Sequence, residues 1–334
     1  PKGASFEFGE SKPVVIGILA TGIDFGPDGA LYMADWIEGW GTKDHGRIWR
    51  LDVANPDKTE RQQTRDLLVA DFSKLQADAL GSHLRNPDMR VRQKAQFELA
   101  TRGSEGLEIF KEALQQRDHQ LARVHAIWGI SQLARKDLKQ GAALVPYLSD
   151  ADPEIRAQAA KWLGDVRYRE AGELLVKMLS DDNARARFFA AEALGRTAYE
   201  PAIQPLVQLL ETNNNEDNYI RHAASLALAR IGQPEPIVAL SAHTSGAVRL
   251  GAVLALRRLK EPGMAVFLKD EDEYIVAEAA RAINDDLSIP EALPALGEVL
   301  KETRFTSEPL LRRAINANLR VGTAGAMQQL IDYA

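Results

Sequence analysis

Two patterns of apolar positions divide the chain. Within residues 14–51 the apolar residues form short runs or alternate with polar ones, which is typical of β-strands. Beyond about residue 64 they recur every three or four positions, the spacing of an amphipathic helix, as far as the C-terminus. The polar stretch 55–64 between the two patterns is interpreted as a linker. We therefore predict a β segment with its linker over residues 1–62, followed by a helical domain over residues 63–334.

Three short runs predict the strands. The first is the apolar run 14–19, the second is 31–35, and the third is 47–51, where polar and apolar residues alternate as in a half-buried strand. A turn is predicted at 26–29, because Pro27 presets φ and Gly29 tolerates a positive φ. The loop 38–46 is polar and rich in glycine. So few short strands cannot bury a core alone, and we expect the sheet to dock on the first helices.

The helical part repeats one frame, in which an apolar residue and Arg are followed by Ala three positions later and Leu four positions after that. The apolar, Ala and Leu positions share a helical face, so each copy predicts an amphipathic helix of about three turns. A shorter apolar helix precedes the frame in several copies, as at 173–179 and 203–210. Copies recur about every 30 residues, and they begin at Val91, Ala122, Ile155, Ala186, Ile220, Val248, Ile275 (without the Arg) and Leu311 (without the Ala).

Helix-start signals precede several copies, at 86–88, 152–154 and 213–218. Two helices per repeat indicate an α-solenoid, because one hairpin cannot cover its own apolar face and stacking supplies the core. We predict an all-α fold, a right-handed α-α superhelix of about eight helical hairpins, with a small N-terminal β segment. The segment 324–334 is interpreted as the first helix of a further hairpin, so we expect the chain to be a piece of a longer protein.

Composition and charge narrow the function classes. Hydrophobic residues make up 45% of the 334 residues and charged residues 26%, as in a globular protein. The net charge of −6 disfavours nucleic acid as the main partner. The chain has no cysteine, which excludes disulfides, thiolate metal sites and thiol nucleophiles. No run approaches the roughly 18 apolar residues that a membrane span requires.

The chemical motifs of common enzymes are missing from the sequence. The six histidines form no His-Glu-x-x-His run, and there is no Gly-x-Ser-x-Gly elbow or phosphate-binding glycine loop. Asp24, Asp28 and Asp35 could be read as Ca²⁺ ligands, but Asp28 is better explained as a turn residue. The acidic run 213–218 lacks the glycine and glutamate of an EF-hand. No catalytic residue, metal or cofactor is predicted.

Two sets of side chains could form a binding surface on the second helix of each hairpin. The Arg of the frame could line the concave face, or it could pair with an Asp or a backbone carbonyl of the neighbouring repeat and order the stack; we favour the second interpretation. Aromatic residues nearby could anchor a partner or pack in the core. The candidate concave-surface residues are Arg123, Trp128, Arg156, Trp162, Arg187, Phe189, Arg221 and Arg249.

Both parts of the chain resemble known families. From about Ala77 onward the repeats resemble the short HEAT repeats of phycobilisome-lyase-like proteins. Residues 22–36 with 46–51 resemble the closing blade of a glucose/sorbosone dehydrogenase-type β-propeller, and bacterial putative membrane-bound dehydrogenases join such a propeller to HEAT repeats. The resemblance implies a periplasmic or extracytoplasmic module for protein interaction or scaffolding, which is not itself an enzyme. Its partner would be an unknown protein or another domain of the parent chain.

Two alternatives remain open at this stage. A quinone-dependent sugar dehydrogenase fragment could retain cofactor or Ca²⁺ binding. However, only about one of some six blades is present, and 19–22 lacks the Arg pair that clamps the cofactor in that family. A HEAT-like nucleic-acid-binding protein is the second alternative, which the negative net charge disfavours.

Overall fold

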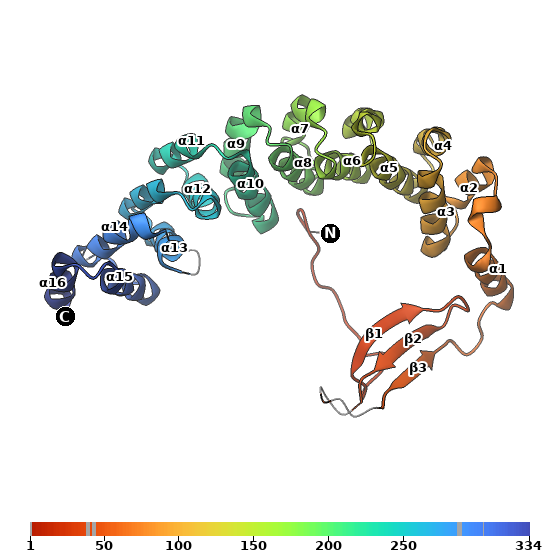
Figure 1. Cartoon of the computed structure of the whole chain (residues 1–334), viewed down its shortest axis with the longest axis horizontal. Coiled ribbons are helices and arrows are strands. Elements are labelled where there is room, and N and C mark those ends of the chain that lie inside the picture. Colours follow the sequence, from red (N-terminus) through yellow and green to blue (C-terminus); the bar gives the residue numbers. More distant parts are fainter. Residues whose placement is uncertain (1, 38–40, 42–44, 286–288, 303) are drawn as a thin grey trace. The chain divides into compact units, whose positions relative to one another are not determined.

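The structure is a computed structural model that describes residues 2–37, 41, 45–285, 289–302 and 304–334. It is predominantly helical, with a three-stranded antiparallel sheet near the N-terminus (Figure 1). The chain divides into two compact units, which are described separately: unit 1 comprises residues 1–6 and 144–334, and unit 2 comprises residues 7–143. The boundary after residue 62 marks a change in periodicity, a different property of the chain, and stays a prediction.

The sheet of unit 2 has the order β1 (Ala20–Phe25), β2 (Leu31–Asp35), β3 (Arg47–Leu51). The predicted turn joins β1 to β2, with Gly29 at φ 76°. The second and third strands are confirmed, but the first was wrong. The tight turn fixes the register and pairs 20–25 with β2, so the apolar run 14–19 lies ahead of the strand. Most of the predicted loop 38–46 lies outside the described residues.

The prediction that β3 is half-buried was also wrong. Ile48 is 77% exposed and Trp49 is 40% exposed. Alternation alone does not bury a strand, because burial needs a second layer over one face of the sheet.

The sheet docks on the first helices of unit 2, as predicted. Arg90, at the start of α3 (Met89–Thr101), donates from Nη1 to the carbonyls of Phe25 (2.9 Å) and Gly26 (2.7 Å). The linker is shorter than predicted. Asp57 accepts the N–H groups of Thr59 and Glu60 and caps α1 (Lys58–Val69), so the helix begins inside the stretch 55–64.

The copies of the frame form the second helices of the hairpins. In unit 2 these are α3 and α5 (Gln120–Ala134), with η1 (Phe72–Lys74), α2 (Ala77–His83) and α4 (Ser104–Leu114) around them. The segment η2 (Leu138–Ser149) leads into unit 1. There the second helices pack in succession as α6 (Pro153–Asp165), α8 (Ala184–Arg196), α10 (Asn218–Ile231), α12 (Gly246–Leu259), α13 (Glu273–Asn284) and α15 (Glu308–Val321).

The first helices of unit 1 are shorter, and several are 3₁₀ or mixed. Proline at or near their starts suits the first turn of a helix. They are η3 (Arg169–Ala171) with α7 (Gly172–Met178), η4 (Glu200–Ala202) with α9 (Ile203–Asn213), α11 (Pro234–Val238) with η5 (Ala239–Ala242), η6 (Pro262–Lys269), η7 (Pro290–Ala292) with α14 (Leu293–Gly297) and η8 (Glu298–Lys301), and finally α16 (Ala324–Tyr333).

The Ala and Leu columns of the frame form the core. In α8, for example, Ala190 and Leu194 are both fully buried, and the equivalent positions of α6 and α10 are buried as well. Alanine at the first column lets neighbouring second helices approach closely, and each buried Leu contributes about 1.5–3 kcal/mol. The predicted all-α solenoid with a small N-terminal β segment is confirmed. Within the described residues, no helix has the length and apolar character needed to cross a bilayer.

Candidate functional site: a groove between two repeats

The arginines of the frame fasten the loop that precedes their own helix. Nη1 of Arg156 donates to the carbonyls of Asp150 (2.9 Å) and Ala151 (3.3 Å), just ahead of the N-cap of α6. The equivalent pairs of carbonyls accept from Arg92, Arg187 and Arg249. Each guanidinium therefore replaces water on the carbonyls of a tight loop.

Two of these arginines also bridge to the next repeat. Arg156 forms a bidentate pair with Asp181, with both N···O distances 2.7 Å, and Arg249 forms one with Asp270 at 2.8 and 3.1 Å. Partial burial alone would raise the pKa of Asp181, but the hydrogen bonds from Arg156 and from Asn183 N–H outweigh it and lower the pKa. These contacts agree with the stack-ordering interpretation of the Arg column; whether any of the arginines also meets a partner stays a prediction.

The acceptors follow a sequence signal that the prediction missed. An Asp or Asn stands two positions before the N-cap residue and accepts its N–H in an Asx turn. Examples are Asp150 before Asp152, Asp181 before Asn183, and Asp270 before Asp272, with distances of 2.8–2.9 Å. The Asp-x-Asp/Asn pattern therefore marks the loops before α6, α8 and α13.

The remaining candidates are distributed along the second helices. Arg123 is buried and donates to the carbonyl of Leu114 (2.9 Å), and Arg221 contacts Asn215 Oδ1 (3.3 Å). Trp162 is half-buried beneath the ammonium of Lys161, 4.1 Å from the ring centroid. Phe189 is half-buried beneath Arg185. The structure brings Arg156 and Arg187 to the same loop, 181–182; it does not gather the eight candidates into one cavity.

Trp128 belongs to a buried polar cluster in unit 2. Its ring meets His125 edge-on at 4.9 Å between centroids. Nδ1–H of His125 donates to Gln96 Oε1 (2.7 Å), and Gln96 donates to Gln132 (3.2 Å). Burial, together with the positive charge of Arg92, lowers the pKa of His125 to about 4.

This cluster predicts a loss of stability on mild acidification. An unfolded histidine has a pKa of about 6.5. Below that pH His125 is protonated in the unfolded chain but stays neutral in the folded chain until the pH approaches 4. The stability that neutral His125 contributes to the folded chain is fully present above pH 6.5 and is lost as the pH falls toward 4. Between about pH 7.5 and pH 5 the free energy of unfolding should fall by about 2 kcal/mol through His125 alone. Urea unfolding of the chain and of His125→Gln at both pH values measures it, and identical pH dependence would contradict it.

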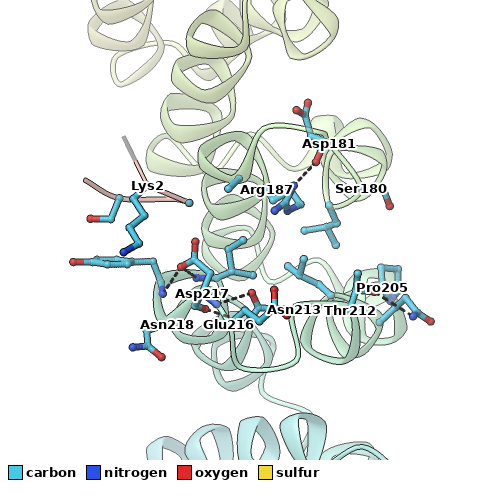
Figure 2. A pocket seen from close by; sticks show the side chains of 18 of the residues that line it. Lys2, Ser180, Asp181, Arg187, Pro205, Thr212, Asn213, Glu216, Asp217 and Asn218 are labelled. Carbon is cyan, nitrogen blue, oxygen red and sulfur yellow. Dashed lines mark hydrogen bonds between the residues drawn. The ribbon is translucent and has the colours of Figure 1, made fainter. Parts of the chain in front are cut away.

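A cavity that was not predicted lies in unit 1 between two repeats. It has a volume of about 1070 Å³ and lies between the C-terminal ends of α7 and α9 and the N-terminal ends of α8 and α10 (Figure 2). Its floor is apolar, with Val176, Leu209 and Ile220, and its rim carries the carboxylates of Glu216 and Asp217. We call it the inter-repeat groove.

The first helix beside this groove is longer than its counterpart one repeat earlier. The step from Arg187 to Arg221 is three residues longer than the step from Arg156 to Arg187. The extra residues lie in α9, which has 11 residues against the 7 of α7, and the short connection 214–217 to α10 has left-handed backbone at Asn214 (φ 42°) and Asn215 (φ 62°). Asn215 stands two positions before the N-cap of α10, where Asp181 stands before α8, so within the described part of the chain Arg187 has no carboxylate partner like the one that Arg156 finds in Asp181. Arg–Asp pairs link neighbouring repeats at Arg156 and Arg249, whereas among the described residues no such pair links the repeats beside this groove.

The N-terminal segment of the chain lies in the inter-repeat groove. Ala4 is only 7% exposed, and its N–H donates to Oδ2 of Asp217 at 2.7 Å. The other oxygen of Asp217 caps α10 by accepting from Tyr219 N–H (2.8 Å) and Ile220 N–H (3.3 Å). The groove thus already holds a short peptide, residues 2–6, which belongs to unit 1 although unit 2 separates it in the sequence from the rest of that unit.

The described residues offer no group of three or more His, Asp or Glu side chains that could hold a metal ion. Asp28 accepts from Ala30 N–H, Tyr32 and Arg50, and Asp35 accepts from Leu19 N–H and the indole of Trp49. These carboxylates hold the sheet together, as the turn interpretation of Asp28 expects.

Comparison with known proteins identifies the repeats. Residues 141–218, which include most of the inter-repeat groove, match the family model for HEAT repeats. The fold is a HEAT-repeat solenoid. Such a fold is consistent with a protein-interaction module. No curated protein matches the chain.

Several solved structures are similar to the chain. An engineered protein is 20% identical, with 84% of this chain and 90% of that chain covered and a TM-score of 0.40. The complex of CpcE and CpcF of phycocyanin lyase from a Nostoc species is 18% identical, with 73% and 94% covered and a TM-score of 0.40. YibA of E. coli is 17% identical, with 73% and 93% covered and a TM-score of 0.44.

Proposed function

We propose that this HEAT-repeat chain is a protein-interaction module that holds a short segment of a partner protein in the inter-repeat groove. The observation that carries the proposal is the peptide already lying there, with Ala4 buried and its N–H bound to Asp217. An apolar floor supplies contact area, and a carboxylate that accepts a backbone N–H fixes the orientation of the segment. Neither contact depends on catalysis, so the groove works as a binding site.

The module would belong to a larger extracytoplasmic dehydrogenase-like protein. The order of a blade-like sheet followed by helical repeats supports this part of the proposal. The full-length gene product tests it: further propeller blades ahead of this chain are expected. Their absence would leave the groove and its partner unaffected but remove the dehydrogenase context.

A matched pair of variants tests partner binding. Asp217 and Tyr219 stand at the N-cap and second position of α10, and Asp272 and Tyr274 occupy the same places on α13, where the tyrosine is likewise exposed. Serine keeps the N-cap but cannot reach a bound segment. The double variant Asp217→Ser/Tyr219→Ser should lose at least about tenfold of the partner recovered by affinity capture, whereas Asp272→Ser/Tyr274→Ser should lose none. Equal recovery by both variants would contradict the proposal.

A further inference from the structure

Residues 2–5 form a tight turn. Lys2 N–H donates to the carbonyl of Ser5 (2.8 Å), and Ser5 N–H donates to the carbonyl of Lys2 (3.1 Å). Gly3, at the first central position, has φ 57°, as in a type II′ turn. The two end residues of the turn form their backbone hydrogen bonds with each other. The N–H groups of the two central residues must therefore find acceptors outside the turn.

Asp217 provides one of these acceptors. Its Oδ2 lies 2.7 Å from the N–H of Ala4, the second central residue of the turn. A charged acceptor makes this bond stronger than one between neutral groups. Because Oδ1 is held by the first turn of α10, the carboxylate is fixed before any ligand arrives. This is the pre-organisation that a recognition site needs.

The first central position is selective for glycine. A Cβ on Gly3 would stand 2.2 Å from Oδ2 of Asp217, and its positive φ disfavours any other residue. The next residue must be small, because Ala4 is buried. Lys2, the first residue of the turn, lines the groove together with the carboxylates of Glu216 and Asp217, so the lining around this cation is acidic. The groove therefore complements the order cation, glycine, small residue.

We propose that the inter-repeat groove recognises a tight turn with the sequence pattern cation–Gly–small in its partner, and that residues 2–6 are an intramolecular copy of this ligand which competes with it. This inference rests on the proposed function and names the ligand of the same groove. The partner must displace a tethered segment, so its apparent affinity is the intrinsic affinity multiplied by the fraction of chains in which the groove is open. The N-terminal segment acts as an autoinhibitory plug.

The experiment uses the full chain and a fluorescent peptide of residues 2–8 as the probe. Gly3→Ala expels the tethered turn, so this variant should bind the probe at least about tenfold more tightly than the unmodified chain. Gly17→Ala is the matched control, because Gly17 also has a positive φ (82°) but no atom near its Cβ position; it should bind like the unmodified chain. Adding Asp217→Ser to Gly3→Ala should weaken probe binding at least about tenfold, whereas adding Asp272→Ser should not.

Two results would overturn the inference. One is probe binding that Gly3→Ala does not strengthen or that Asp217→Ser does not weaken. The other is a backbone N–H of Ala4 that exchanges with solvent in the unmodified chain as fast as in the free peptide. Partner capture separates the two proposals, because equal recovery by the groove variant and its matched control contradicts the proposed function whatever the probe shows. Capture that depends on the groove without any probe binding would leave the module intact and refute the turn as its ligand.

Discussion

Replacing Asp270 by Ala is expected to lower the free energy of unfolding by about 3–5 kcal/mol, because the substitution leaves a buried guanidinium without its counter-charge. The side chains of Arg249 and Asp270 are 9% and 3% exposed. Arg249 donates to Asp270 from Nε at 2.8 Å, and the hydrogen bonds to Asp270 raise the pKa of Arg249. A guanidinium is effectively always protonated in proteins, so the arginine stays charged when Asp270 is gone. The Asx turn to Asp272 N–H is lost at the same time.

The neighbouring residue provides the control. Glu271 also contacts Arg249, at 3.5 Å, but its side chain is 87% exposed. An exposed ion pair contributes about 0–1 kcal/mol, so Glu271→Ala should scarcely change stability. Urea unfolding of both variants at neutral pH measures the difference. Comparable losses would show that the Arg column does not fasten one repeat to the next.

The contrast between these two acids also shows what the sequence could reveal. The frame predicts the second helices because its Ala and Leu columns are buried in copy after copy, and periodicity reports burial directly. The Asp-x-Asp/Asn loops were equally visible but were overlooked, because a search for helical period passes over residues in loops. The first strand was misplaced for a different reason. An apolar run such as 14–19 resembles a strand, but the turn at 26–29 sets the pairing.

The inter-repeat groove could not be predicted from local pattern. It depends on the extra length of one helix, α9, and on a segment more than two hundred positions away, where Ala4 donates to Asp217. The pattern of the run 213–218 predicts a helix start, and the structure places only 214–217 between α9 and α10, so the run is not a long loop and gives no sign of the groove beside it. The eight candidate residues lie at positions that recur in the second helices. Such positions recur along the whole solenoid, so they do not indicate which repeat binds a partner. A site arises where the repetition fails, as it does beside Arg187.

The same reasoning identifies glycines that keep the stack close. Gly195 in α8 faces α10, and a Cβ there would stand 2.6 Å from Cα of Ala227; Gly164 in α6 meets Cα of Ala193 at the same distance. A backbone atom cannot rotate away, so an added methyl group must push the two helices apart. The variant Gly195→Ala should therefore lose about 3 kcal/mol of stability, at the upper end of the cost of overpacking.

Alanine normally stabilises a helix relative to glycine by up to about 1 kcal/mol, which gives this prediction its control. Gly325 in α16 has no atom near its Cβ position, so Gly325→Ala should be neutral or slightly stabilising in the same urea unfolding experiment. If Gly195→Ala lowers the free energy of unfolding and Gly325→Ala does not, contact between neighbouring second helices decides the effect of the added methyl group. If Gly195→Ala were as harmless as Gly325→Ala, α8 and α10 would have to be further apart than the stack requires, and the burial of the Ala column would lose its explanation.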